Sequence, residues 1–342
     1  MNGILIANFP KLSCQFTPRR LPFVCRYYLF AFWSNAGGRG GIWLRRILKM
    51  IFPLVRSLGG FSRGEFEFRT PARTSVIRFN PRNLEYSQIY NERIFKNGYE
   101  IEVSALLDLL LPESGVFYDI GSNWGYHVLM TASRRPRLNV HAFEPAPETF
   151  QDLTGCLQQA GLAQSVTCHN FALSSCDGTA FIRVPDHINS GSAEVSTAGG
   201  DAPITTRRLD ALDLPKPDVI KMDVENHELE VLKGAVETLR SKQPYIIFEN
   251  KLNLADLAKM LEIFEFLAVQ GYRFFCPAVL RDPGGRNFLL PCNWLPSADS
   301  DRLALVPFTT LTRLICPPEL NVFACHESRL PELMETFQAW KE

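Results

Sequence analysis

Three side chains that can exchange a proton stand close together in the middle of the chain, namely Asp223, Glu225 and His227. Carboxylates and imidazoles are common general bases in enzymes, and they also hold reacting hydroxyl groups by hydrogen bonds. We therefore predict that these residues position a hydroxyl group and accept its proton during a group transfer. The alternative is that the two acids only bind backbone N–H groups at the start of the following helix, where negative charge is favoured.

A divalent metal is a second use for carboxylates in this region. Asp223, Glu225 and Glu249 follow two predicted strands and offer three oxygen ligands, which suit Mg²⁺ or Ca²⁺. No histidine and no recognisable ligand spacing accompany them. We therefore predict no metal site.

A glycine-containing loop, Asp119-Ile-Gly-Ser-Asn-Trp-Gly125, follows an apolar run and precedes a helical pattern. Gly121 and Gly125 allow a tight turn and a close approach of the backbone to a ligand. The carboxylate of Asp119 suits a ligand with a cationic amine better than a pyrophosphate, and the spacing differs from G-x-G-x-x-G. Glu144 ends the next strand and is placed to accept hydrogen bonds from both hydroxyls of a ribose. The alternative interpretation of the loop is a purely structural turn.

Short β-rich runs alternate with helical patterns from residue 116 onward, which is typical of βαβ units. The strand candidates are 116–121, 138–145, 165–173, 218–225, 244–250, 272–278 and 321–327. We predict an α/β fold with a doubly wound, mostly parallel, seven-stranded sheet. Residues 280–320 lack a clear period, so we expect a loop that acts as a lid or packs as a surface insertion.

The motifs of residues 116–250 occur in an order that resembles the FkbM family of S-adenosylmethionine-dependent O-methyltransferases. The matching segments are FYDIGSNWGYH, HAFEPAPETFQDL, the Arg208-Leu-Asp210 step, IKMDVENHELEVLKGA and PYIIFE. The resemblance implies a Rossmann-like class I methyltransferase fold with S-adenosyl-L-methionine as cofactor. By the same resemblance, the methionine end of the cofactor is lined by Asp119, Gly121, Asn123 and Gly125, and its ribose is held by Glu144.

The family's acidic strand-end motif falls on Lys221, Asp223, Glu225 and Glu228. The family commonly reads D-V-E-G-x-E, whereas Asn226 replaces the glycine here. Asn226 is therefore expected to narrow or re-aim the acceptor pocket. Because asparagine tolerates left-handed backbone geometry, we expect the turn itself to persist.

The resemblance implies methylation of a sugar hydroxyl in a glycan, a glycolipid or an oligosaccharide signal. A polyketide or other small-molecule hydroxyl is the alternative acceptor. A catalytically silent, cofactor-binding partner in glycan assembly is a further alternative, and the missing glycine favours it. An NAD-dependent oxidoreductase is disfavoured because the chain lacks G-x-G-x-x-G.

Charge is distributed unevenly along the 342 residues, although the formal net charge is zero. Residues 1–64 carry ten Lys or Arg and no Asp or Glu, so the remainder has a net charge of −10. An acidic body of this kind argues against a nucleic-acid partner. The nine cysteines include no C-x-x-C pair, which argues against a zinc site and favours a reducing, cytoplasmic location.

The basic segment 42–56, IWLRRILKMIFPLVR, has the pattern of an amphipathic helix. Its apolar side chains fall on one side of the helix, and its Arg and Lys residues lie away from that side. Such a helix can lie at the surface of an anionic membrane, and we expect this to be the inner face of the membrane. The alternatives are that it docks on the acidic body or that the chain starts at Met50. We assign residues 1–64 to a basic extension, 65–115 to a lead-in segment and 116–342 to the methyltransferase domain.

Overall fold

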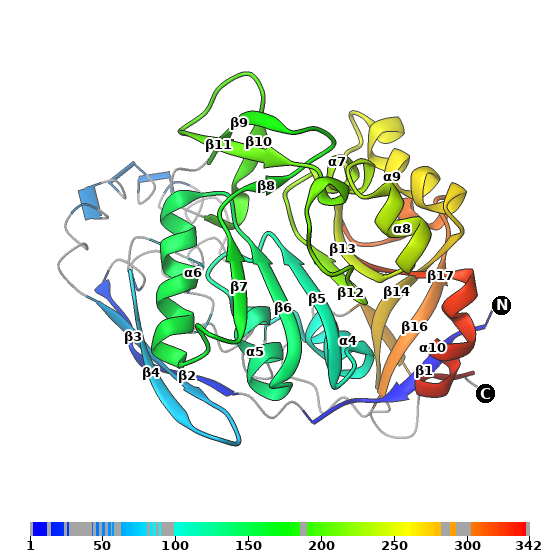
Figure 1. The fold of residues 1–342 in the computed structure, drawn as a ribbon, viewed down its shortest axis with the longest axis horizontal. Coiled ribbons are helices and arrows are strands. Elements are labelled where there is room, and N and C mark those ends of the chain that lie inside the picture. The colour runs from blue at the N-terminus through cyan, green and yellow to red at the C-terminus, as the bar shows by residue number, and fades with distance from the viewer. Residues whose placement is uncertain are drawn as a thin grey trace.

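The central element of the fold is a long twisted sheet with helices on both faces (Figure 1). The computed structural model describes residues 3–11, 15–22, 63–80, 99–184, 190–281, 288–291 and 302–339, and scattered positions in 23–57 and 83–89. Within these residues the sheet has eleven strands, and the seven strands predicted from sequence lie side by side. Their order is β7 (Val166–His169), β6 (Arg137–Phe143), β5 (Ser114–Ile120), β12 (Val219–Met222), β13 (Tyr245–Lys251), β17 (Glu319–His326) and β14 (Tyr272–Arg281).

The direction of these strands creates a binding edge. Strands β7, β6, β5, β12 and β13 run parallel, whereas β17 is antiparallel to both β13 and β14. The chain winds outward from β5 through β6 to β7, then returns to the other side of β5 at β12. Such a reversal opens a crevice at the carboxyl ends of the strands, which is where doubly wound folds bind ligands.

Helices cover the sheet on both sides. Neighbouring residues of a strand face opposite sides of the sheet, and nearly every residue of the central strands is buried, so both faces must be covered. The first face, which carries Phe117 and Val140, packs with α4 (Ile101–Leu110), α5 (Tyr126–Arg134) and α6 (Pro147–Ala160). The second face, which carries Tyr118 and Ile220, packs with α7 (Glu228–Lys233), α8 (Val236–Lys242) and α9 (Leu257–Val269). The predicted doubly wound α/β class is therefore confirmed.

Four antiparallel strands extend the predicted seven, and two of them correct an expectation. They are β15 (Phe288–Pro291), β16 (Arg302–Phe308), β1 (Leu5–Asn8) and β18 (Gln338–Ala339), which α10 (Leu330–Thr336) precedes. The prediction of an irregular loop over residues 280–320 is wrong for β15 and β16, which both pair with β14. In β16 the reason is burial. Leu303, Ala304 and Leu305 are fully buried there, and so short a buried run has no period to detect.

Two smaller sheets flank the main one. A four-stranded sheet is formed by β8 (Ala172–Leu173), β9 (Gly178–Arg183), β10 (Glu194–Ser196) and β11 (Ala202–Arg207). A three-stranded antiparallel sheet is formed by β2 (Gln15–Arg20), β3 (Gly64–Arg69) and β4 (Thr74–Phe79), and β4 contacts α6 through a hydrogen bond from Arg78 N to Gln159 Oε1 (2.9 Å).

Residues of the predicted basic extension take part in these sheets, because β1 pairs with β16 and β2 pairs with β3. The boundaries at residues 64 and 115 stay predictions. Among the described residues, no helix combines the length and the hydrophobicity that a membrane span requires.

Candidate functional site

Two adjoining hollows open at the carboxyl ends of β5, β6 and β12. The smaller hollow has an empty volume of about 590 Å³, and the larger one has about 1040 Å³, each including its open mouth. Both are lined by Gly121, Asn123, Gly191, Asp223 and Glu225. The predicted ligand loop and the predicted acids therefore meet where the two hollows join.

The loop after β5 is held in a conformation that glycine makes possible. Gly121, Asn123 and Gly125 have φ values of 78°, 49° and 93°. A Cβ atom on Gly121 would lie 1.9 Å from the carbonyl oxygen of Asp223, so no other residue fits without moving the chain. The N–H of Gly121 donates to the Phe143 carbonyl oxygen (2.9 Å), which ties the loop to the end of β6.

Glu144 lies at the end of β6, in the wall of the smaller hollow, and is only 7% exposed. Its Oε2 accepts from the Asn123 N–H (3.0 Å) and its Oε1 from the Ala146 N–H (2.9 Å). Burial raises the pKa of this carboxyl to about 7, although both backbone hydrogen bonds lower it. A carboxylate offers about four acceptor positions, so about two remain, which is the number that two ribose hydroxyls need.

The rest of the smaller hollow is mainly apolar. Phe143, Phe171, Leu173, Ile182 and Val195 contribute to its wall. Flat aromatic rings bind well in hollows lined by such side chains. The smaller hollow therefore fits a nucleoside whose base contacts the apolar wall and whose ribose faces Glu144.

His227 borders the smaller hollow and is absent from the lining of the larger one. Its Nε2 lies 3.0 Å from the Ser174 hydroxyl oxygen, and burial lowers its pKa. The structure thus places this predicted base on the nucleoside side of the site. Its part in proton transfer stays a prediction.

Asp119 lies beneath the loop, is 1% exposed and lines neither hollow. Neither of its carboxylate oxygens has a hydrogen-bond partner in the described part of the chain. Burial raises its pKa, and Lys221, whose Nζ lies 3.7 Å from Oδ1, opposes that rise. Because Asp119 is buried below both hollows, its predicted interaction with a cationic amine of a ligand stays a prediction.

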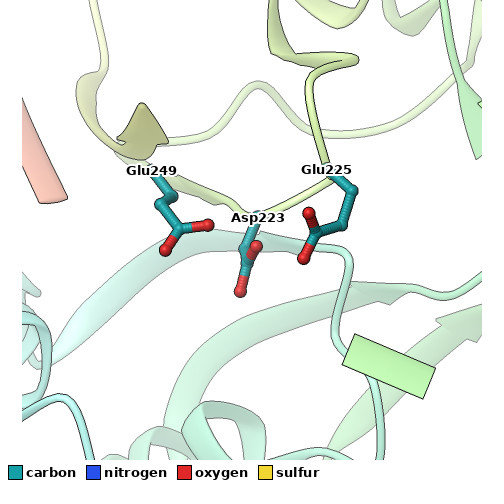
Figure 2. Close-up of side chains that lie close together, drawn as sticks. All are labelled: Asp223, Glu225 and Glu249. Carbon is teal, nitrogen blue, oxygen red and sulfur yellow. The ribbon is translucent and has the colours of Figure 1, made fainter. Parts of the chain in front are cut away.

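The acidic cluster stands at the ends of β12 and β13. Figure 2 shows the side chains of Asp223, Glu225 and Glu249 turned toward one another, and one oxygen of each lies within 4.8 Å of the others. The ammonium group of Lys251 contacts Glu225 and lies 3.3 Å from Glu249. Lys221 approaches from the other side, 3.6 Å from Asp223 Oδ2. Two ammonium groups thus supply the positive charge that a divalent ion would bring.

Burial raises the pKa of Glu249 well above its ordinary value, and the neighbouring Asp223 adds to the rise. At neutral pH this carboxyl group is therefore mostly protonated and can donate a hydrogen bond. From the sequence, Glu249 was predicted only as a candidate metal ligand. Its position at a strand end, like that of Asp223, was the signal that could have marked it as part of the site.

The turn after β12 keeps the expected backbone despite the missing glycine. Glu225 and Asn226 have φ values of 52° and 69°, so asparagine does adopt the left-handed geometry. Glu228, at the start of α7, stabilises the turn because its Oε1 accepts from the Val224 N–H (3.1 Å). Asp210 lines neither hollow and instead caps α8, where its Oδ1 accepts from the Thr238 N–H (2.9 Å).

Several lining residues come from segments in which sequence reasoning found no chemistry. Glu100, just before α4, places its Oε2 2.9 Å from Nε2 of His127 on α5. Both line the larger hollow, together with Glu85, Tyr99 and Glu319. The short helix η3 (Ser190–Ser192) borders both hollows through Gly191. His127 ends the FYDIGSNWGYH segment, whereas no local motif marks the other residues, because only the fold brings them to the site.

Known proteins resemble this chain over the same region. Residues 119–274 match the methyltransferase FkbM domain. The hexuronic acid methyltransferase AglP of Haloferax volcanii is 38% identical over 192 residues, which cover 54% of this chain and 76% of that protein. The 2-O-methyltransferase NoeI of Sinorhizobium fredii is 26% identical over 232 residues, covering 56% and 92%. The solved structure of methyltransferase FkbM from Methylobacillus flagellatus aligns with a TM-score of 0.38 and 16% identity, covering 82% of this chain and 58% of that one.

Proposed function

The chain belongs to the FkbM methyltransferase family, and from that premise we propose that it methylates a sugar hydroxyl in a glycan, a glycolipid or an oligosaccharide. It is a methyltransferase that uses S-adenosylmethionine. The observation that carries the proposal is the meeting of the cofactor loop and the acidic cluster at the junction of the two hollows.

The residues of the smaller hollow fit the adenosine part of the cofactor. When bound, S-adenosylmethionine supplies a methyl group on a positively charged sulfur, which an oxygen nucleophile can attack. Glu144 binds the ribose hydroxyls, and the apolar wall contacts the adenine. Asp119 balances the charge of the amino group from beneath the loop. Gly121 lets the loop pass close to the Asp223 carbonyl, so that its backbone lies in the wall of both hollows.

Asp223 and Glu225 line both hollows, so they stand between the cofactor side and the larger hollow. In the proposed reaction the acceptor sugar enters the larger hollow. The Asp223 carboxylate takes the hydroxyl proton, and Glu225 orients the hydroxyl oxygen. His227 is a second proposed base, and its place on the nucleoside side makes Asp223 the first residue to test.

The sugar acceptor is supported by the relatives, since AglP is named for a hexuronic acid and NoeI for 2-O-methylation. A polyketide or other small-molecule hydroxyl is the alternative acceptor. The retained left-handed turn at Asn226 gives no support to a catalytically silent protein, because the acids after β12 keep their place at the junction.

Calorimetric titration with S-adenosylmethionine and S-adenosylhomocysteine tests the cofactor site. Glu144→Gln should weaken binding about 10- to 100-fold, because it removes a charge-assisted acceptor from the ribose. Glu148→Gln, an exposed change in the first turn of α6, is the matched control and should bind like wild type. A folded wild-type protein that binds neither compound would refute the proposal.

Asp223→Asn separates binding from catalysis. It should leave cofactor affinity within about twofold of wild type and lower turnover about 10²- to 10⁴-fold, the usual contribution of a general base. The assay is S-adenosylhomocysteine release with an oligosaccharide acceptor. Retained turnover would remove Asp223 from the proton-accepting role.

We also propose that residues 42–56 contact an anionic membrane at its inner face. The described positions among them are helical, and Trp43, Met50 and Leu54 are 65%, 80% and 64% exposed on the expected apolar stripe. Arg46 is exposed as well, whereas Arg45 and Lys49 lie outside the described residues. Large apolar side chains beside basic ones suit an interface that contains anionic lipid.

Vesicle sedimentation tests this contact. Full-length protein should bind phosphatidylglycerol vesicles more than phosphatidylcholine vesicles, and Trp43→Ser with Met50→Ser should reduce binding at least fivefold. Val269→Ser, at an apolar residue that is 86% exposed on α9, is the control. If the double variant binds vesicles as well as the wild-type protein does, the proposal is contradicted. If the wild-type protein forms concentration-dependent dimers that the double variant does not form, the apolar stripe contacts a second copy of the chain instead.

A further inference from the structure

Glu100 enters the larger hollow from the turn before α4, and its backbone adopts a conformation that is costly for glutamate. Its φ and ψ values are 43° and 63°, in the left-handed region, and it directly precedes Ile101, the first residue of the helix. It lines the larger hollow together with Asp223. Strained conformations of this kind persist only where the surrounding structure holds them, and they cluster at functional sites. The strain at Glu100 therefore points to a function for its side chain.

The carboxyl group of Glu100 is paired with the imidazole ring of His127 on α5. Its Oε2 lies 2.9 Å from His127 Nε2, and only 16% and 4% of the two side chains are exposed. Both residues line the larger hollow. Burial lowers the pKa of His127 to about 3, so the ring is neutral and holds the carboxyl group through a hydrogen bond rather than through charge.

Glu100 keeps hydrogen-bonding positions beyond this pair. A carboxylate offers about four acceptor positions, and a protonated carboxyl group also offers one donor. His127 and Asn321 use two of these positions, so about two remain for a ligand. Burial raises the pKa of Glu100 and Lys221 opposes the rise, and either protonation state can bind a hydroxyl group. The side chain is thus suited to a hydroxyl group of a ligand in the larger hollow.

A second observation concerns the other nitrogen of the His127 ring. His127 is 3% exposed, and its Nδ1 has no hydrogen-bond partner in the part of the chain that the structure describes. A buried polar atom without a partner costs free energy, and in a native structure it calls for an explanation such as a role in the active site. A ring that only stabilised the fold would be expected to have both nitrogens bonded. The pair therefore belongs to the function of the hollow.

Resting on the proposed function, we propose that Glu100 binds a second hydroxyl group of the acceptor sugar while Asp223 binds the reacting one, and that His127 positions Glu100. The charge of Asp223 acts on the Glu100 carboxyl group, as expected for two side chains that lie near each other on one hollow. The substrate class is a sugar with a free hydroxyl group beside the methylated one. A site whose buried groups bind a substrate hydroxyl rejects the analogue that lacks it, because those groups lose their partner.

Removal of the carboxyl group tests the binding role in the full-length protein. The acceptor is the most active of three p-nitrophenyl glycosides, namely the glucoside, the galactoside and the mannoside, assayed by S-adenosylhomocysteine release. Glu100→Met should raise KM for this acceptor at least tenfold, while kcat stays within about threefold and cofactor affinity within about twofold. Glu100→Gln should raise KM only about two- to fivefold, because the amide can still bind a hydroxyl group.

Glu102→Met is the matched control for Glu100→Met. Glu102 lies two residues away and also has a pKa raised by burial, but it lines neither hollow. Its variant should keep the wild-type KM within about twofold. A wild-type KM in both Glu100 variants overturns the inference and leaves the proposed function standing. A wild-type protein that binds S-adenosylmethionine but neither binds nor methylates any of the three glycosides overturns both.

Monodeoxy analogues of the same glycoside identify the hydroxyl group that Glu100 contacts. The wild-type protein should not methylate the analogue that lacks the acceptor oxygen. With the analogue that lacks the neighbouring hydroxyl group, kcat/KM should fall at least tenfold. In Glu100→Met this second loss should shrink to about threefold or less, because the partner of that hydroxyl is already gone. An equal loss in both proteins overturns the inference.

Two variants of His127 test its positioning role. His127→Phe keeps a flat ring without nitrogen, so it should raise KM for the acceptor at least threefold and leave cofactor affinity unchanged. His127→Gln can keep a hydrogen bond to Glu100 and should restore KM to within about twofold of wild type. A wild-type KM in His127→Phe, or the same rise in both variants, would remove His127 from this role.

Discussion

Replacing Lys251 with methionine tests how the acidic cluster is balanced. The ammonium group of Lys251 contacts Glu225 and lies 3.3 Å from Glu249. Methionine keeps much of the side-chain length and removes the charge. Three carboxyl groups with oxygens within 4.8 Å of one another would then lose the cation between them.

The size of the effect follows from Coulomb's law. The substitution removes the attraction between the Lys251 ammonium and the Glu249 carboxylate, which lie 3.3 Å apart. At an effective dielectric constant of about 20 this attraction is about 5 kcal/mol, or about 4 pKa units, and solvent screening of the partly exposed lysine reduces it to about half or less. Glu249 already has a raised pKa, from burial first and from Asp223 second. Loss of the ammonium raises the pKa of Glu249 and Glu225 further, so the cluster keeps its protons to a higher pH.

The pH dependence of methyl transfer measures this change. A base works only above its pKa, so the rising limb of the rate should move toward alkaline pH by about 1 to 2 units in Lys251→Met. The variant should also bind Mn²⁺, because three oxygen ligands are then available to a cation. Lys233→Met, which removes a partly exposed lysine from an ion pair with Glu230, is the matched control.

Two results would refute this reasoning. The first is a wild-type enzyme that loses activity with a chelator and recovers it with Mn²⁺, since Lys251 would then not provide the positive charge of the cluster. The second is an unchanged pH profile in Lys251→Met. Calorimetric Mn²⁺ titration and rates measured from pH 6 to 10 distinguish these outcomes.

Three further predictions concern stability, each measured by denaturant unfolding. Glu102 is buried against the side-chain amide of Asn321 (2.9 Å), and burial raises its pKa from 4.5 to about 7. The folded state therefore loses stability as pH rises between these values. Glu102→Gln should increase the free energy of unfolding by about 2 to 3 kcal/mol at pH 8 but change it little at pH 5. The same effect at both pH values would contradict this prediction. Arg313 is fully buried and donates to Asn250 Oδ1 (2.6 Å). Arg313→Met should therefore lower the free energy of unfolding by about 3 kcal/mol or more. A loss of less than about 1 kcal/mol would show that these hydrogen bonds do not stabilise the fold. Asp210→Ala should cost about 1 to 2 kcal/mol through loss of the α8 cap, and no change in stability would show that the cap is dispensable.

Features that depend on neighbouring residues could be predicted from the sequence. Gly121 and Gly125 mark a turn because their backbone angles are a local property, and both indeed have positive φ. The strand that ends at Glu144 was recognisable from its apolar run. Asp223 and Glu225 reached the site as expected, because the carboxyl ends of parallel strands meet at one edge of the sheet. The fold class, the methyltransferase family and the cofactor followed from these motifs together.

Features that depend on distant segments could not be predicted. The pairing of Glu100 with His127 joins the segment before α4 to α5, and the bond from Asn321 to Glu102 spans 219 residues. Strand β16 gave no signal, because a short run that is buried on both faces has no alternation of polar and apolar residues.

The sequence by itself determined the fold class, the glycine-containing turn after β5 and the acids at the strand ends, since residue type and spacing control backbone turns and strand formation. Only the tertiary structure decided which charges meet. Lys251 lies between two acids because β13 aligns beside β12. Glu319 and Glu100 line the same hollow because β17 and the segment before α4 meet there. Electrostatic interactions depend on distance through space and on burial, and neither quantity can be read from separation along the chain.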